Sequence, residues 1–526
     1  MESRLRHHRG RALIAALLVL AATVAFLEVW QATRGGDGVS RDSVDYLAAA
    51  QSIVRGDGVT LPYPSYNEPP PVDFTGGQAE ALTTFPPLFP SVIALGSMVS
   101  GRGGLDVARL LNALAFSLIV ALTGLLVWRM SRSWLWSAAA SAATLFSPNL
   151  ILVSSMVWSD AWGTLLVLGC VLLLTDYLRA PRLLLLLAAA LVASAAIMDR
   201  YEAIALIPVG LAAVLMSRSR PGRALHGAVW TAVALLPVAA WSTRDLLQSG
   251  GLSGGALRWH PPPVTMLPSA IDTLVGYLSP VPWLNVSVVV ALVVLAAVWL
   301  APRGRRAWRG FHRGTLLIGI GIAALVAVLV ATTFLVDASL TVDYRILALV
   351  YVLCVAAFAS HLGRWSAGWR RSFRFAAWAP LLTLTGISTL ACLQSIPTLS
   401  ASFGYTSSSW GQSPLLTSVN RLPVGAFVVT NAPDFVWLRD GRKTVAEPRL
   451  VIAISGQPNP DYAADMAQVQ AAVALQGRGW LVLWNGDARW YLPSTGQLQA
   501  ALHLVPYQTT SDGQIFEILP ASPSSG

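Results

Sequence analysis

The sequence predicts a helical protein that crosses a membrane many times and carries a small α/β domain at its C-terminal end. Three observations predict this fold class. Hydrophobic residues make up 55% of the 526 residues and charged residues only 12%, whereas a soluble globular protein has about 25% charged residues. Apolar runs of membrane-spanning length recur as far as residue 395, and after that the composition becomes that of a soluble domain. This excludes a cytoplasmic enzyme, a disordered scaffold and a nucleic-acid-binding protein.

Eleven apolar runs account for the expected membrane spans. The hydrocarbon core of a bilayer requires roughly 20 apolar residues per helix. On that basis we expect spans at residues 12–30, 107–128, 134–153, 160–178, 183–198, 203–217, 224–243, 283–301, 314–336, 344–362 and 375–395. A further apolar segment at residues 86–101 is 16 residues long and begins at two adjacent prolines. We expect this segment to lie at the membrane surface.

The placement of arginine predicts the orientation of the chain. The formal net charge is +10. With a cytoplasmic N-terminus and no crossing at residues 86–101, the arginine-rich loops face the cytoplasm, at residues 129–132, 179–182, 218–223, 303–313 and 364–374. This agrees with the positive-inside rule, whereas a crossing at residues 86–101 would turn all of these loops outward. We therefore expect a multi-pass protein of the inner or plasma membrane, with a retained N-terminal anchor and an extracytoplasmic C-terminal domain.

The chain divides into two expected domains. Residues 1–395 form the transmembrane domain, with a long first external loop at residues 31–106, and residues 396–526 form the external α/β domain. The predicted strands of the second domain are at residues 425–431, 449–455, 479–485 and 514–519, and its predicted helices are at residues 462–476 and 496–503. Strands that alternate with helices indicate a small layered α/β domain.

The acidic residues at the start of the first external loop have two explanations. Asp42 can cap a helix over residues 43–54, with Asp45 at the third helical position of a capping box. Asp42, Asp45 and Tyr46, at spacings i, i+3 and i+4, also share one helix face directly after the first span. A carboxylate at this place can act as a general base on a substrate held at the lipid boundary. Asp42 and Asp45 are therefore candidate catalytic residues, and Tyr46 is a candidate binding residue.

A second candidate group lies in the sequence MDRYEA. It joins two apolar runs of 16 and 15 residues, which as helices extend roughly 24 Å, less than the ~30 Å core of a bilayer. Asp199, Arg200 and Glu202 are therefore expected below the outer surface, where charged side chains are usually paired or functional. An ion pair of Asp199 with Arg200 is the structural alternative. Asp160, at the outer start of another span, either joins this group or only satisfies the helix dipole.

A third candidate group, Asp343, Tyr344 and Arg345, lies at the outer boundary of a late span. An arginine guanidinium can bind a phosphate through two parallel hydrogen bonds. The alternative is an arginine that snorkels to the membrane surface, but snorkelling does not require a neighbouring carboxylate and tyrosine. These three residues are therefore candidates for binding an anionic group of a substrate.

Taken in order, these motifs resemble those of the GT-C glycosyltransferases. The series runs from DSVDY through PPLFP, WSDA and DRYE to DYR, and a C-terminal external domain follows it. It is similar in particular to the bacterial dolichyl-phosphate-mannose-protein mannosyltransferase and aminoarabinose transferase-like group, over about residues 10–365. The sequence departs from the pattern at two positions. Ser43 follows Asp42 where many relatives have a second acid, and Phe85 stands where many have a histidine.

The resemblance implies an inverting transfer of a sugar from a polyprenyl-phosphate donor to an acceptor outside the cytoplasm, either an envelope glycan, a lipid or a protein. Asp42 would take the proton of the acceptor hydroxyl, and Arg345 with Arg200 would stabilise the departing phosphate. We expect no cofactor. A divalent metal stays open as an alternative but is not indicated, because no second carboxylate adjoins Asp42. The expected partners are the lipid-linked donor, the acceptor and membrane lipids, and no nucleic acid.

Two other classes of protein stay open at this point. A transporter or flippase for a lipid-linked substrate would have its site near the bilayer midplane, between inverted repeats, whereas the charged residues here gather at one boundary. A membrane-anchored assembly protein would bind glycan through its C-terminal domain, but eleven spans with recessed charges exceed what an anchor requires. The transferase is therefore the favoured hypothesis.

Overall fold

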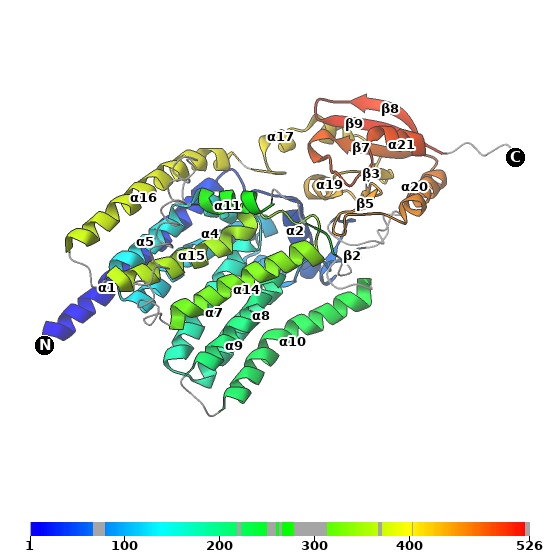
Figure 1. Ribbon diagram of the computed structural model, residues 1–526. Coiled ribbons are helices and arrows are strands. Elements are labelled where there is room, and N and C mark those ends of the chain that lie inside the picture. Colours follow the sequence, from blue (N-terminus) through cyan, green and yellow to red (C-terminus); the bar gives the residue numbers. More distant parts are fainter. Residues whose placement is uncertain are drawn as a thin grey trace.

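The structure is a computed structural model that describes residues 2–66, 79–217, 222–249, 259–261, 266–277, 313–366, 371–401 and 403–520. It confirms the expected fold class, because a mostly helical chain with several long apolar helices is followed by a small C-terminal sheet region. The expected span at residues 283–301 lies outside the described residues. Figure 1 shows the helices as one bundle, with the sheet region at one end of it.

Six helices in the described part of the chain are long and apolar enough to cross a membrane. They are α1 (Glu2–Ala32, apolar from Ala12), α4 (Gly104–Ser131), α7 (Asp160–Arg179), α10 (Arg223–Ser249), α14 (Arg313–Leu335) and α15 (Tyr344–Trp365). Each lies at an expected span. α11 (Met266–Gly276) lies between α10 and α14 in the chain, and α16 (Arg371–Ser400) covers the expected span at residues 375–395. The chain is therefore a multi-pass membrane protein.

Three expected spans are not single long helices. The run at residues 134–153 folds as two helices that are bent by 56° at a short break. Pro148 explains the break, because the residue before a proline is kept out of the helical conformation and Ser147 is extended. The two bent helices are α5 (Trp134–Leu145) and α6 (Pro148–Ser155). The other two expected spans are short: the first is α8 (Leu183–Asp199), and the second is η1 (Tyr201–Ala205) followed by α9 (Leu206–Met216). The described residues thus show fewer full-length spans than the eleven expected.

The short helices leave a polar turn inside the bundle. α8 has 17 residues and extends about 25 Å. Arg200 then adopts an extended conformation, and the 3-10 helix η1 follows it. Asp199 is only 1% exposed, and the side chain of Arg200 is 18% exposed. The turn is therefore buried, as its position between two short apolar runs predicts.

The loop between α1 and α4 covers one end of the bundle. Its two helices, α2 (Arg41–Arg55) and α3 (Leu88–Ser100), lie side by side. The ring of Tyr46 packs against those of Phe85 and Phe89, with centroids 5.0 and 5.2 Å apart. α3 has 13 residues and extends about 20 Å, which is too short to cross the ~30 Å core. The same loop contains the short antiparallel strands β1 (Thr60–Leu61) and β2 (Glu80–Ala81).

The C-terminal region contains a five-stranded mixed sheet with the order β4-β3-β7-β9-β8. β3 is parallel to β4 and β7, and β9 is antiparallel to β7 and β8. The strands are β3 (Val428–Thr430), β4 (Val445–Ala446), β7 (Gly479–Trp484), β8 (His503–Thr509) and β9 (Gly513–Leu519). The helices are α17 (Ser408–Gly411), α18 (Pro414–Val419), α19 (Pro433–Asp440), α20 (Tyr462–Gln476), η3 (Asn485–Asp487) and α21 (Thr495–Ala501).

Most elements expected in this region form, with one correction. The run at residues 449–455 does not join the main sheet. Only β5 (Val451–Ile452) forms there, and it pairs with β6 (Gln457–Pro458) in a separate hairpin. β8 was not expected, because most of its residues are exposed and Pro506 interrupts the strand pattern. A proline is tolerated at the edge of a sheet, and the β8–β9 register shifts at Pro506.

The sheet region packs on α2 through a shared hydrophobic cluster. Val44 of α2 is buried in the same cluster as Phe435 and Trp484 of the sheet region. The loop that follows α2 also contacts the sheet region, since the Tyr66 hydroxyl donates a hydrogen bond of 3.2 Å to the backbone oxygen of Thr430. The position of α2 is therefore set by the C-terminal region as well as by the bundle.

Candidate functional site

The side chain of Arg345 lies at the centre of an ion-pair cluster at this end of the bundle. Its Nη1 contacts the carboxylate of Asp42 in α2, and its Nε donates a hydrogen bond of 2.9 Å to Oδ2 of Asp160 in α7. Its guanidinium lies over the ring of Trp158, 4.6 Å from the centroid. Nη2 of Arg345 has no hydrogen-bond partner among the described residues. This nitrogen remains available to an incoming anion.

Arg200 continues the cluster on the other side of Asp160. Its Nη1 lies 2.8 Å from Oδ1 of Asp160, and its Nε donates a hydrogen bond of 2.9 Å to Oε1 of Glu202. Nη2 of Arg200 contacts the same carboxylate oxygen, so two nitrogens of one guanidinium group hold Glu202.

The first turn of α2 is held from three directions, which brings Asp42 to Arg345. The Oγ of Ser40, at the N-cap, accepts a hydrogen bond of 2.7 Å from Nε1 of Trp158. Arg41 donates to Oδ1 of Asp487 in the sheet region, with a distance of 3.1 Å from its Nε. One turn later, the Tyr46 hydroxyl lies 3.3 Å from Ser159 Oγ. The consecutive residues Ser40, Arg41 and Asp42 therefore bind three different parts of the chain, namely Trp158, the sheet region and Arg345.

The capping explanation of Asp42 is wrong. The helix begins at Arg41 with Ser40 as the N-cap, and the backbone N–H of Ser40 donates a hydrogen bond of 3.0 Å to Ser43 Oγ. Serine and aspartate cap helices about equally well, so the sequence alone could not decide between them. Asp42 contacts Arg345 instead, as a side chain of the first helical turn.

The structure does not bring Asp45 into the cluster. This residue is 1% exposed, and its carboxylate accepts hydrogen bonds from the Tyr63 hydroxyl and from Ser65 Oγ, the latter at 3.0 Å. The i, i+3 spacing predicts one shared face, but Asp42 contacts Arg345 of the bundle whereas Asp45 contacts the loop at residues 60–66. Asp45 thus stabilises the loop at residues 60–66, and its catalytic role stays a prediction.

Asp343 and Tyr344 lie next to the cluster but do not join it. Asp343 is the N-cap of α15, and its side chain accepts hydrogen bonds from the backbone N–H groups of Arg345 (2.9 Å) and Ile346 (3.3 Å). The backbone oxygen of Tyr344 accepts a hydrogen bond from the Tyr277 hydroxyl. Both residues therefore fix the start of α15, and Asp343 acts on Arg345 through the backbone.

Asp199 does not pair with Arg200, so this expected ion pair is wrong. Arg200 binds Asp160 and Glu202 instead, and neither oxygen of Asp199 has a hydrogen-bond partner within the described ranges. Gly163 lies directly beside these side chains. A Cβ added there would lie 2.8 Å from Cδ of Arg200 and 3.2 Å from Oδ2 of Asp199. The glycine therefore permits the close approach of the polar turn to α7.

Four residues of the site were not predicted from the sequence: Trp158, Ser159, Ser40 and Gly163. Three of them lie in the sequence WSDAWG, which contains the expected Asp160. A tryptophan two positions before a recessed acid was the available signal, because aromatic faces attract guanidinium groups. Ser40 could have been recognised as a competing N-cap.

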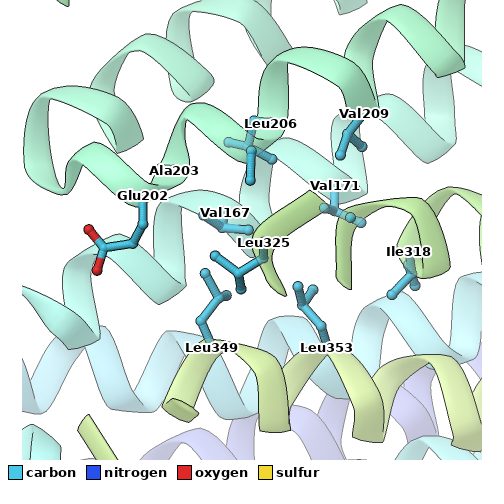
Figure 2. A pocket seen from close by; sticks show the side chains of 12 residues that line it. Val167, Val171, Glu202, Ala203, Leu206, Val209, Ile318, Leu325, Leu349 and Leu353 are labelled. Carbon is cyan, nitrogen blue, oxygen red and sulfur yellow. The ribbon is translucent and has the colours of Figure 1, made fainter. Parts of the chain in front are cut away.

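Two small voids adjoin the cluster. The first has a volume of about 20 Å³ and is lined by Asp160, Arg200 and Arg345 together with apolar side chains. The second, also about 20 Å³, is lined almost entirely by aliphatic side chains of α7, α9, α14 and α15. Figure 2 shows the carboxylate of Glu202 at one end of the second void and Leu353 and Ile318 toward the other. Each has room for about one water molecule, and the two voids share part of their lining.

No group of three or more histidine, cysteine, aspartate or glutamate side chains that could hold a metal ion occurs in the part of the chain that the structure describes. The carboxylates of Asp42 and Asp160 are bridged by Arg345. The residues present therefore form an ion-pair cluster whose positive charge comes from guanidinium groups.

No family model and no curated protein matches this sequence, but solved structures resemble its fold. ArnT from Cupriavidus metallidurans bound to undecaprenyl phosphate has 16% sequence identity and a TM-score of 0.57, over 97% of this chain and 98% of that one. The apo oligosaccharyltransferase of Archaeoglobus fulgidus has 12% identity and a TM-score of 0.54, over 89% and 69%. The arabinofuranosyltransferase AftD from Mycobacteria has 15% identity and a TM-score of 0.52, over 96% and 40%. At these identities the likeness shows the fold alone.

Proposed function

We propose that this chain, which has the GT-C fold, is a glycosyltransferase that moves a sugar from a polyprenyl-phosphate donor to an extracytoplasmic acceptor with inversion at the anomeric carbon. The observation that carries the proposal is the contact of Arg345 with both Asp42 and Asp160 at one end of the bundle. This contact supports the proposal of a carboxylate base beside a cation that binds the phosphate. The similar structure of ArnT was solved with undecaprenyl phosphate bound, which supports the class of donor.

The cluster supplies the groups that a single displacement requires. Asp42 accepts the proton of an acceptor hydroxyl, whose oxygen forms a bond to the anomeric carbon of the sugar. The bond from that carbon to the phosphate oxygen breaks, and its electron pair leaves with the polyprenyl phosphate. Arg345 and Arg200 stabilise the charge that develops there. Attack from the face opposite the leaving group inverts the anomeric centre.

The donor phosphate and Asp42 would bind the same guanidinium group. Nη1 of Arg345 contacts Asp42 and its Nε donates to Asp160, so a phosphate would bind at Nη2. Arg345 would in this way hold the donor beside the carboxylate that takes the proton of the acceptor.

The surroundings of the cluster fit a donor with a charged head and an apolar tail. The void beside Arg345 and Arg200 is a neighbour of the aliphatic void, because Val167, Glu202 and Leu325 line both. A phosphate would bind at the arginines and the first isoprene unit would point toward Leu325. Burial of a phosphate at two guanidinium groups strengthens both contacts, because the local dielectric is low.

The orientation of the chain follows from the same proposal. The arginine-rich ends of α4 and α7 face the cytoplasm, so the cluster, α2 and the C-terminal sheet region face the outside of the inner or plasma membrane. The acceptor is an envelope glycan, a lipid or a protein on that side. Two guanidinium groups provide the positive charge at the leaving group, so we expect no divalent metal to be required.

The proposal is tested with a deletion strain, by mass spectrometry of its lipid-linked sugars and envelope glycans. We expect a polyprenyl-phosphate sugar to accumulate and one envelope component to lose that sugar. The wild-type gene and an Asp57→Asn control, which changes an exposed acid of the same loop, should restore the sugar, whereas Asp42→Asn should not. Unchanged envelope glycans, or a donor that changes only its distribution across the membrane as a flippase would cause, would contradict the transferase.

A further inference from the structure

A second charged site lies at the opposite ends of the helices that carry the cluster. α7 begins at Asp160 in the cluster and ends at Arg179, and α15 has Arg345 in its first turn and Arg364 in its last. Twenty residues of α-helix extend about 30 Å, which is the thickness of the hydrocarbon core of a bilayer. The two sites are therefore on opposite faces of the membrane, whichever way the chain is oriented.

The second site contains a cavity of about 480 Å³. Its lining residues are Ile14, Ala15 and Leu18 of α1, Leu125, Trp128 and Arg129 of α4, and Arg132 and Arg179. This volume is within the range of about 300 to 1,000 Å³ that is typical of ligand sites. One wall is aliphatic and the other carries three arginines, so the cavity is amphipathic.

The arginines are held in place around the cavity. Arg129 and Arg179 both contact Asp176, with 3.0 Å between Nη1 of Arg179 and Oδ1 of Asp176. Nη2 of Arg179 also donates a hydrogen bond of 2.6 Å to the backbone oxygen of Arg129. The guanidinium of Arg132 lies over the ring of Trp128, 5.0 Å from the centroid. These contacts orient the guanidinium groups before any ligand binds.

The positive charge at this site exceeds the negative charge that the structure supplies. Arg179 lies close enough to Arg129 and Arg132 to be repelled by both, and Arg364 is repelled by Arg179 in turn. Asp176 is the acid that Arg129 and Arg179 contact among the described residues. Like charges gathered in this way destabilise the folded state, and a bound anion would remove that cost.

Arg132 has an unusual backbone conformation for an arginine. Arg132 ends α4 with φ of 59°, and no other residue except glycine has a positive φ within the described ranges. A helix C-terminus of this geometry normally has glycine, because a side chain costs about 1 kcal/mol or more there. The guanidinium of Arg132 lies over the Trp128 ring, and both residues line the cavity. The positive-inside rule alone requires an arginine in this loop, but not at this position.

We propose that this cavity binds the phosphate headgroup of an anionic phospholipid. Arg129, Arg132 and Arg179 contact the phosphate, and the acyl chains lie along Ala15 and Leu18 of α1. The aliphatic wall favours a lipid over a free phosphate ion, because a free ion gains nothing from apolar surface. The site is separate from Asp42 and Arg345, so this inference does not depend on the transferase chemistry.

The test is native mass spectrometry of the full chain in detergent, with phosphatidylglycerol or phosphatidylcholine added in equal amounts. We expect phosphatidylglycerol to be retained in preference. Arg132→Gln should lower its retention about fivefold, the effect of one arginine near an anionic surface. Ala15→Trp should lower it as well, because it fills the cavity without changing charge. Arg313→Gln is the matched control, since Arg313 lies at the same membrane face beside Met216, outside the cavity.

Several results would overturn the proposal. Equal retention of the two lipids would show that charge is not recognised, and an equal loss in Arg313→Gln and Arg132→Gln would show a general effect of net charge. Displacement of phosphatidylglycerol by an equimolar amount of inorganic phosphate would identify a free anion as the ligand. Preferential retention of undecaprenyl phosphate over phosphatidylglycerol would make the cavity a second donor site.

Discussion

Arg41 and Asp487 form an ion pair between the first turn of α2 and the C-terminal sheet region, across 446 positions of the sequence. Asp487 is 2% exposed and also accepts hydrogen bonds of 2.9 Å from Arg489 and from the Tyr405 hydroxyl. Burial alone would raise the pKa of Asp487, but Arg489 and Arg41 outweigh it, so the pKa lies below its ordinary value. Because Arg41 adjoins Asp42, the sheet region helps to position the proposed base.

The first prediction is that Arg41→Gln lowers sugar transfer while the chain still folds. Arg41 is half-exposed and touches neither Arg345 nor Asp160, so its loss should displace the first turn of α2 rather than remove a reacting group. A displacement of about 1 Å can cost up to 10²-fold in rate. We expect kcat to fall and KM for the donor to change little. Arg55→Gln, at the exposed C-terminal end of α2, is the control and should behave as wild type.

The second prediction concerns Arg345→Lys, which keeps the charge. A lysine ammonium cannot reproduce the planar fork that contacts Asp42 and Asp160 together and lies over Trp158. We expect much of the transfer activity to be lost, measured as restoration of envelope sugar in the deletion strain. Arg102→Lys, an exposed arginine before α4, should restore it fully. Full activity of Arg345→Lys would identify Arg345 as a snorkelling residue.

The sequence predicted the members of the site better than their partners. Asp42, Asp160, Arg200 and Arg345 were each proposed separately from their place at one boundary of the spans, and the structure brings all four together. Their pairing depends on how α2, α7, η1 and α15 pack, which no local pattern contains. Arg200 therefore pairs with Asp160 across the bundle instead of with its sequence neighbour Asp199.

The long helices were predictable because the length of an apolar run is enough to identify a membrane span. The resemblance to the GT-C glycosyltransferases is confirmed at the level of the fold. The kink at Ser147–Pro148 and the edge strand around Pro506 were missed, because proline acts on one residue within an otherwise regular apolar pattern. Asp45 pairs with Tyr63 and Ser65 because the loop at residues 60–66 folds back onto α2, and no local sequence pattern predicts that path of the chain.

The third prediction tests the orientation of the chain with single cysteines in a background that lacks the three native ones. A cysteine at Ser408, an exposed position of the sheet region, should react with a membrane-impermeant reagent in intact cells. A cysteine at Arg182, an exposed position between α7 and α8, should react only after the cells are opened. The reverse pattern would contradict the proposed topology and the extracytoplasmic acceptor.

The fourth prediction is a pH dependence of stability that comes from Glu447. This side chain is buried, its Oε1 has no hydrogen-bond partner among the described residues, and burial raises its pKa from 4.5 to about 8. Between those two values the folded state retains a proton that the unfolded state has released, so stability falls as the pH rises. Below 4.5 both states are protonated and the cost is absent.

Replacing Glu447 by glutamine removes this titration. We expect the melting temperature of wild-type protein in detergent to fall between pH 5 and pH 8 relative to that of Glu447→Gln, and the difference to stay constant above pH 8. Asp461→Asn changes an exposed acid of the same region and should leave the wild-type slope unchanged. Parallel curves for wild type and Glu447→Gln would show that Glu447 is ionised in the folded protein.

The fifth prediction separates the two acids of α2. Asp42→Asn keeps the size of the side chain and leaves the N-cap at Ser40 intact, so the helix should form and the protein should express and insert normally. Asparagine cannot take a proton from the acceptor, and loss of a general base typically costs 10²- to 10⁴-fold in rate. We therefore expect Asp42→Asn to transfer little sugar in the deletion strain, with KM for the donor less affected than kcat.

Asp45→Asn should have the opposite profile. Its side chain can still accept one hydrogen bond from Tyr63 or Ser65 but loses the charge that both hydroxyls contact, and a hydrogen bond to a charged group contributes about 1.5–3 kcal/mol. The expected result is a lower melting temperature with near wild-type transfer by the protein that remains folded. Near wild-type transfer by Asp42→Asn together with an inactive, normally folded Asp45→Asn would show that the base is Asp45. Activity in both variants would remove the catalytic role from α2, because no other acid of that helix reaches the cluster among its described residues.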